Sequence, residues 1–156
     1  MKKGFTLLEL LLVVAIIGIL SSVILTALAT ARNRANDAKV KAHLSQAKAA
    51  AEIYSEINNG YGSANVSVVT GGTSCTGVMF TDTVSGMAVY GNSTNYPGGT
   101  RLVCVQNLSA FAFAASLSSA GRYWCVDSTG DPGEITISNP AAIVAADDTC
   151  VEMDLK

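Results

Sequence analysis

One acidic residue lies inside a long apolar segment near the start of the chain. Glu9 is the single charge between Phe5 and Ala31, a run long enough to cross a bilayer, for which roughly 20 apolar residues suffice. An ionised carboxylate in hydrocarbon costs on the order of 2 to 3 kcal/mol or more, so it needs a positively charged partner. Arg32 and Arg34 are many helical turns away. The partner of Glu9 is therefore expected on another molecule or at a newly created amino terminus.

The cysteines are the next residues whose chemistry matters, because they could form disulfide bonds or bind a metal. The chain has 4, all beyond the apolar run, at Cys75, Cys104, Cys125 and Cys150. Their spacings contain no C-x-x-C pair, which argues against a zinc site. An even number in a small domain that follows a membrane-spanning run indicates two disulfides, for which 3 pairings exist, and free buried thiols are the alternative. Each closed loop is expected to stabilise the domain by roughly 3 kcal/mol in the chain-entropy model.

An acidic loop could bind a cation. Asp127, Asp131 and Glu134, in the sequence DSTGDPGE, carry oxygen atoms of the kind that calcium binds. Their spacing differs from that of an EF-hand loop, and Asp-Ser-Thr-Gly-Asp-Pro-Gly is more often a simple turn. We therefore expect a turn without a metal, and no cofactor.

The sequence offers little for catalysis or for nucleic acid binding. It contains no G-x-S-x-G motif, no phosphate-binding loop and no H-E-x-x-H motif. His43 is the single histidine, and we expect it to be solvated on the polar face of a helix. Asp147 and Asp148 are likewise expected to be a solvated pair. The net charge is −2, or −4 without Lys2 and Lys3, which gives no basic surface for nucleic acid. We expect a structural or binding protein, not an enzyme.

A helix is expected to position Glu9 and to continue far beyond the apolar run. Residues 32–57 contain neither proline nor glycine, and Asn59-Gly60 supplies a stop signal. We expect one helix from Phe5 to Asn58, with its first half in lipid or among sister helices. Its second half carries an apolar stripe at spacings of three and four, expected to pack on the rest of the chain: Val40, Leu44, Ala47, Ala51, Tyr54 and Ile57.

After Gly60 the pattern changes to short β-like segments separated by turns. Alternation of Phe111, Phe113, Ala115 and Leu117 predicts a strand with one face on the helix. Together these features predict an α+β fold, in which a small antiparallel sheet lies on the second half of a long helix. The predicted strands are residues 65–70, 77–81, 87–90, 101–106, 109–117 and 122–127.

Two general explanations of the N-terminal segment compete. An ordinary transmembrane anchor explains its length but leaves Glu9 unexplained. A secretory signal peptide explains Ala29-Thr30-Ala31, which fits the small-residue cleavage pattern. Its apolar region, however, is usually only ~7 to 15 residues long. A third explanation accounts for both the length and the acid.

The residues around Glu9 form a specific motif. Lys2-Lys3-Gly4-Phe5-Thr6-Leu7-Leu8-Glu9-Leu10 combines a short basic leader, a glycine, a phenylalanine directly after it and a glutamate four residues further on. It resembles the signal sequence of type IV prepilins and of the related type II secretion pseudopilins. The resemblance implies cleavage between Gly4 and Phe5 by a prepilin peptidase and N-methylation of Phe5. It also implies that Glu9 pairs with the Phe5 amine of a neighbouring subunit, and such a pair makes burial tolerable and fixes the register of the subunits.

The same resemblance implies an architecture of the type IV pilin kind. Residues 1–4 would be a leader, 5–31 the transmembrane and assembly half of the helix, 32–58 its amphipathic half, and 59–156 a β-rich globular region. Disulfide pairing is implied in the same way: Cys125 with Cys150, closing the C-terminal region, and Cys75 with Cys104.

The function implied is that of a pilin, which polymerises through its N-terminal helix into a type IV pilus filament. The implied partners are other subunits, the prepilin peptidase, and an assembly platform with its ATPase. The precursor is expected in the cytoplasmic membrane, with its domain outside, and the assembled subunit in an extracellular filament. A secretion pseudopilin is the alternative, followed by a signal-anchored or secreted binding domain. Adhesion, twitching motility, DNA uptake and protein secretion are the processes that such filaments serve.

Overall fold

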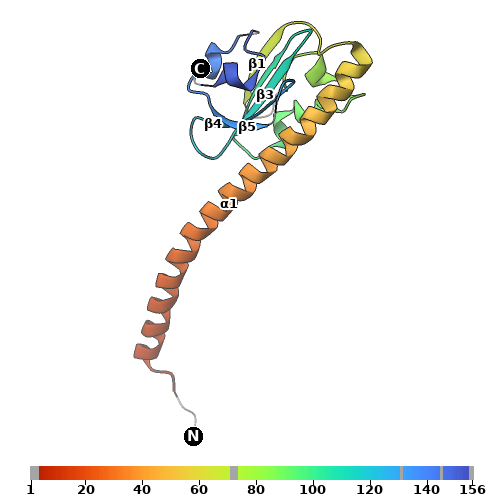
Figure 1. Ribbon diagram of the computed structural model, residues 1–156. Coiled ribbons are helices and arrows are strands. Elements are labelled where there is room, and N and C mark those ends of the chain that lie inside the picture. Colours follow the sequence, from red (N-terminus) through yellow and green to blue (C-terminus); the bar gives the residue numbers. More distant parts are fainter. Residues whose placement is uncertain (1–3, 71–73, 131, 145, 155–156) are drawn as a thin grey trace. The chain divides into compact units, whose positions relative to one another are not determined.

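The first element of the fold is the long helix α1, which spans Leu7–Asn58 (Figure 1). The computed structural model describes residues 4–70, 74–130, 132–144 and 146–154. The chain divides into two units, Met1–Ala35 and Asn36–Lys156. Helix α1 ends where Asn59 and Gly60 adopt φ angles of 54° and 139°, a left-handed turn of the kind that terminates helices. The predicted single helix is confirmed, and it begins two residues later than expected.

Five antiparallel strands form one sheet in the second unit, in the order β1-β2-β3-β4-β5. Strand β3 is central, and its Phe113 lies opposite Cys104 of β2 and Val126 of β4. Since side chains alternate along a strand, these three point to the same face of the sheet. The predicted antiparallel α+β fold is confirmed. The strands are β1 (Asn65–Thr70), β2 (Arg101–Gln106), β3 (Phe111–Ser116), β4 (Arg122–Asp127) and β5 (Gly133–Thr136).

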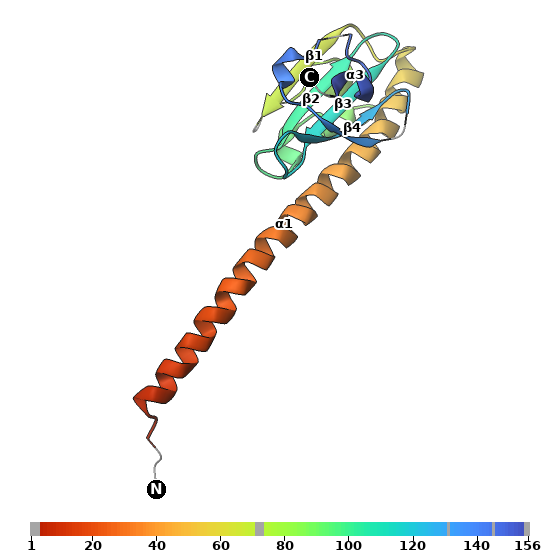
Figure 2. The ribbon, with the colours of Figure 1, turned by 60° about the vertical axis from the view of Figure 1, so that its left-hand side comes forward.

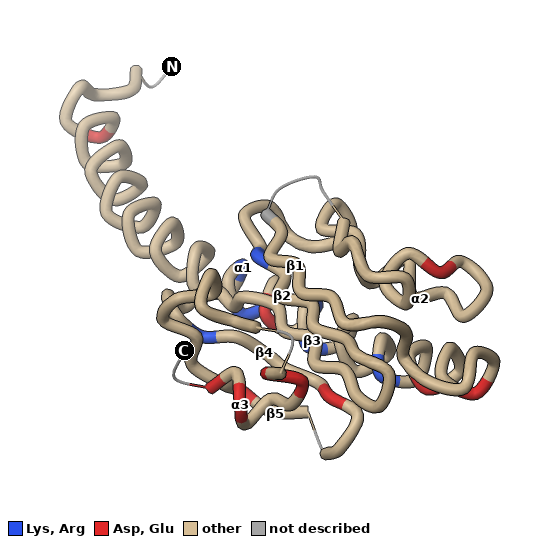
Figure 3. Tube along the Cα trace, turned by 90° about the horizontal axis from the view of Figure 1, so that it is seen from above, with Lys and Arg blue, Asp and Glu red and all other residues tan. Residues whose placement is uncertain are grey.

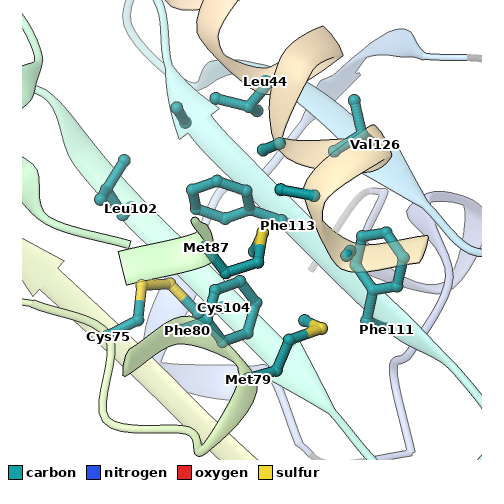
Figure 4. Close-up of a cluster of buried hydrophobic side chains, with 14 of the residues drawn as sticks. Leu44, Cys75, Met79, Phe80, Met87, Leu102, Cys104, Phe111, Phe113 and Val126 are labelled. Carbon is teal, nitrogen blue, oxygen red and sulfur yellow. A yellow bond between two sulfur atoms is a disulfide. The ribbon is translucent and has the colours of Figure 1, made fainter. Parts of the chain in front are cut away.

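The second half of α1 covers one face of this sheet. The stripe predicted from the sequence is buried from Val40 to Tyr54, and it packs with Phe111 and Phe113 of β3 in one apolar cluster (Figure 4). Ile57, the last predicted member, is instead 56% exposed. Two successive steps of three residues turn the stripe by about 60° each, because a helix turns 100° per residue. Ile57 has thereby rotated away from the sheet.

The C-terminal segment covers the opposite face of the sheet, which the sequence analysis did not predict. Ala112 and Ala114 of β3 are fully buried there, in a second cluster with Ile137 and Met153. Helix α3 (Cys150–Met153) belongs to this layer and contacts β3, β4 and β5 (Figure 2). The two small alanine side chains allow the covering segment to approach the strand closely. The sheet is therefore the middle layer of three.

Two disulfides connect the sheet to chain segments packed on its two faces. Cys75 is bonded to Cys104 of β2, with 6.1 Å between their Cα atoms. Cys125 of β4 is bonded to Cys150 at the start of α3, with 5.8 Å between the Cα atoms. These are the pairs implied by the resemblance. Cys104 belongs to the cluster under α1 and Cys125 to the opposite cluster, so each face of the sheet has one covalent attachment.

Two predicted strands are helical in the structure, and one strand of the sheet was not predicted. Residues 77–81 and 87–90 were predicted as strands, but they contain the 3-10 helix η1 (Met79–Thr81) and the helix α2 (Met87–Tyr90). The Met79 amide donates to the buried side chain of Gln106, so it has no strand neighbour, and Gly86 starts α2 with a φ of 84°. Strand β5 was not among the predicted strands and directly follows the predicted turn at residues 128–132.

Candidate assembly site

The first half of α1 exposes its apolar side chains. Every residue from 4 to 35 is exposed, and Leu7, Leu8 and Phe5 have 75% or more of their surface accessible. By length and composition, α1 is the one helix in the described part of the chain that could cross a membrane. Exposed apolar surface of this extent marks a contact with lipid or protein.

Thr6 and Glu9 together cap the start of α1. The amide and the hydroxyl of Thr6 each donate to Glu9 Oε2, at 2.9 Å. In return the Glu9 amide donates to Thr6 Oγ1 at 3.2 Å. This reciprocal pair is a capping box, which satisfies donors that have no partner inside the helix. Thr6 was not among the predicted site residues, although a threonine three residues before a glutamate is the sequence signature of this cap.

The cap leaves the Glu9 carboxylate able to bind a cation. An ionised carboxylate can accept about four hydrogen bonds, and Thr6 supplies two. The start of a helix also favours a negative charge, because the helix dipole is positive there. Gly4 and Phe5 lie just before α1 in irregular backbone, and both are exposed. The site therefore combines an open Gly4-Phe5 bond with a negative charge four residues further on.

Comparisons with known proteins agree with this geometry. A family model described as the prokaryotic N-terminal methylation motif matches residues 1–25, which contain Gly4, Phe5 and Glu9. The chain is also 40% identical over 100 residues to the type IV wide pilus major component PilA4 of Thermus thermophilus, a match that covers 63% of this chain and 76% of the relative. The chain belongs to the type IV pilin family. No solved structure shows significant similarity to it.

Asp127, which the sequence analysis considered as a calcium ligand, is a structural residue of this pilin. It is 4% exposed, and its Oδ1 accepts from the amides of Thr129 and Gly130 at 2.9 and 2.8 Å. Its Oδ2 accepts from the Cys150 amide at 2.7 Å. Burial raises the pKa of Asp127, but the hydrogen bonds from Cys150, Thr129 and Gly130 outweigh it and the net pKa is lowered. The carboxylate joins the end of β4 to the start of α3.

The other acidic residues of that loop do not complete a metal site with Asp127 in the described part of the pilin. Glu134 accepts from Arg122 Nε at 2.8 Å, and its Oε2 lies 3.7 Å from Lys41 Nζ. Asp131 lies outside the described residues. Among the residues that the structure describes, no group of three possible ligands comes together. The oxygen atoms of Asp127 and Glu134 are thus engaged by amides and cations.

Replacing Asp127 by asparagine is expected to destabilise the pilin by about 1 to 3 kcal/mol, because an amide NH₂ then faces a backbone donor in a buried site. Because the folded pKa of Asp127 is lowered, its contribution to stability is complete above the unfolded pKa and is lost as the pH falls through the folded pKa. Urea unfolding of the full chain in detergent between pH 6 and pH 3 measures both effects.

The matched control is Asp154→Asn. Asp154 is exposed, and its carboxylate also accepts from a backbone amide, that of Thr136, at 2.7 Å. We expect this change to cost less than about 0.5 kcal/mol. Equal stability losses and equal pH profiles in the two variants would show that burial of Asp127 has no special role.

Two further expectations about this pilin need correction. His43 was expected to be solvated, but its ring is half-buried between Tyr90 and Tyr96, with ring centroids 6.1 and 5.2 Å away. Burial lowers the pKa of His43, and the charge of Lys39 lowers it further. Asp147 was expected to be a solvated acid, but it is 6% exposed and accepts from the Val144 amide at 2.9 Å. In both cases the partner comes from a distant segment or a local turn that no helical or strand period predicts.

Proposed function

We propose that this pilin is the repeating subunit of a type IV pilus filament, and that it assembles through the exposed first half of α1. The observation that carries the proposal is the combination of the exposed, mostly apolar segment 4–35 with the capped carboxylate of Glu9. Lipid would cover this surface in the precursor, and the helices of other subunits would cover it in the filament. The relative is named as a major component of a pilus, which favours a pilus over a secretion pseudopilus.

Processing at the N-terminus is part of the proposal. A prepilin peptidase would cut the bond between Gly4 and Phe5 and free the Phe5 amine, which the family then methylates. In a neighbouring subunit that ammonium would bind the Glu9 carboxylate, which is already held in place by Thr6. An assembly platform and its ATPase would lift the subunit from the cytoplasmic membrane into the extracellular filament.

The first test is the mass of the N-terminal peptide of the mature protein isolated from cells. We expect a peptide that begins at Phe5 and carries the mass of one added methyl group. Electron microscopy of sheared surface filaments, with peptide identification, then shows whether this chain is their main component.

A Gly4→Glu variant serves as the control, since it alters the junction and leaves α1 unchanged. This precursor is expected to remain uncut in the membrane. A wild-type mature protein that begins at Arg32 or Met1 would overturn the proposal and leave a secreted or anchored domain.

A further inference from the structure

An apolar groove runs between the second half of α1 and the helix α2. Ala49 and Ile53 line it from α1, and Val89 and Tyr90 line it from α2. Ile53 and Val89 are 51% and 53% exposed, although each lies on an element whose other side is buried. We call this feature the α1–α2 groove. Exposed aliphatic side chains on both walls indicate that another surface covers it.

Two glutamates of α1 neighbour the lining residue Ile53 without lining the groove themselves, and we call them its rim. Glu52 and Glu56 lie on either side of Ile53 along α1, and both are exposed. Glu52 accepts a hydrogen bond from the Tyr61 hydroxyl at 3.1 Å. Within the described residues, the ion pairs at 4.0 Å or less all involve Glu134, so neither rim carboxylate has a cation. Figure 3 shows acidic residues towards the C-terminal end of α1. An occupant of the groove should be apolar and positively charged.

The same chain carries a segment with this chemistry. Leu25, Leu28 and Arg32 lie on one face of α1, since they are spaced by three and four residues, and they line one exposed surface. The leucines are 66% and 62% exposed. Arg32 is exposed too, and it forms no ion pair within the described part of the chain. The face therefore presents two large apolar side chains followed by a cation.

We propose that the Leu25–Arg32 face of one subunit docks in the α1–α2 groove of another subunit. Leu25 and Leu28 then pack against the small side chain of Ala49 and beside Ile53, and Arg32 binds Glu52 and Glu56. With the two helices parallel, Leu28 lies opposite Ala49 when Arg32 lies between Glu52 and Glu56 along the partner helix. This inference rests on the proposed function, because it needs a second copy of the pilin.

The proposal fixes an offset between the two subunits. Arg32 opposite Glu52 or Glu56 requires a shift of 20 to 24 residues along α1. The pairing of Phe5 with Glu9 requires a shift of only 4 residues. A helical polymer offers several kinds of neighbour, so the two contacts hold together in one filament. The neighbour that fills the groove is a more distant one along the filament axis.

Charge exchange tests the contact. Arg32→Glu and the double change Glu52→Arg with Glu56→Arg each place like charges opposite one another, so we expect about tenfold fewer filaments from either. Combining all three changes restores opposite charges and is expected to return the yield to within about twofold of wild type. The readout is the amount of pilin in sheared filaments relative to the membrane pool. Arg34→Glu is the matched control, since residue 34 lies on the other side of the helix, and its yield should stay near wild type.

Cross-linking gives a second readout that does not depend on charge. Leu28→Cys combined with Ala49→Cys is expected to form disulfide-linked dimers and longer chains in oxidised filaments. The four native cysteines are already paired, so they do not interfere. Thr30→Cys with Ala49→Cys is the control, because residue 30 lies on the other side of the helix from Leu28, and it should give few links.

The possible results test the proposed contact, distinguish it from a contact of Arg32 with lipid, and test the proposed function separately. A normal filament yield from Arg32→Glu, or no cross-links in filaments of the variant that combines Leu28→Cys with Ala49→Cys, would overturn the contact. A loss with Arg32→Glu that the triple exchange does not restore would also overturn it and would assign Arg32 to lipid phosphates. Absence of this chain from wild-type filaments would instead overturn the proposed function.

Discussion

Filaments are expected to be lost when Glu9 is replaced by glutamine. The amide oxygen of glutamine still accepts from Thr6, so the cap on α1 remains, but the negative charge that would bind the Phe5 ammonium of a neighbour is gone. Removing one partner of a close pair of buried charges costs several kcal/mol, and each added subunit repeats this loss. We expect at least about a hundredfold fewer filaments, measured by electron microscopy and by the sheared fraction, with an unchanged amount of pilin in the membrane.

A second variant separates the charge of Glu9 from its role in the cap. Thr6→Ala removes the hydroxyl that donates to Oε2 and accepts from the Glu9 amide, while the carboxylate remains. This change should cost the helix start about 1 kcal/mol and reduce assembly much less than Glu9→Gln does. If Thr6→Ala abolishes filaments and Glu9→Gln does not, capping rather than charge pairing is the function of Glu9.

Removing the disulfide between Cys125 and Cys150 is expected to lower the stability of the globular unit strongly. The bond closes a loop with a sequence separation of 25, which corresponds to about 3 kcal/mol in the chain-entropy model. Its loss also frees α3 and the segment that covers the Ala112 face of the sheet. We expect the Cys125→Ser, Cys150→Ser variant to unfold at clearly lower urea concentration, measured by circular dichroism of the full chain in detergent.

The matched comparison is the variant that combines Cys75→Ser with Cys104→Ser. That loop has a similar sequence separation, 29, so the entropy model predicts a similar loss. Reduction of the wild type under the same conditions should lower its stability at least as far as either variant. If either variant unfolds at the same urea concentration as the oxidised wild type, non-covalent packing alone holds the segments that the disulfides attach to the sheet.

Much of the fold follows from local patterns in the sequence. Strands β1, β2 and β4 begin and end at the predicted residues, because each is a short apolar run between glycine, proline or polar turns. Strand β3 is slightly shorter than predicted, but Phe111, Phe113 and Ala115 face the helix as their alternation indicates. The long helix was predictable because residues 32–57 contain no helix breaker.

The wrong strand predictions share a physical cause: contacts between distant parts of the chain decide the local structure there. Met79, Phe80 and Met87 are buried, and their apolar run looks like strand. Their backbone is helical: the Met79 amide donates to the Gln106 side chain and not to a strand, and α2 begins after Gly86, whose φ is 84°. Strand β5 is only four residues long, so too few side chains alternate for a period to appear.

The assembly site was predictable only in part. Glu9 is conspicuous because it is the single charge in an apolar run. The cap formed with Thr6 was missed for two reasons. A lone charge in an apolar run suggests first that a cation binds it, and the helix was expected to begin at Phe5, one residue before the capping threonine. The α1–α2 groove was not predictable, since it depends on the fold of residues 77–90, most of which were expected to form strands.

The placement of the two disulfides has a mechanical consequence. A subunit pulled at Asn59 and at its C-terminal end cannot extend the chain inside either closed loop, even after its hydrogen bonds break. The loops, with sequence separations of 29 and 25, hold back roughly 180 Å of extended chain at the reach of about 3.4 Å per residue. Under tension the domain can yield only in its outer segments and in the stretch between Cys104 and Cys125, so it behaves as a short tether with a built-in limit on stretching.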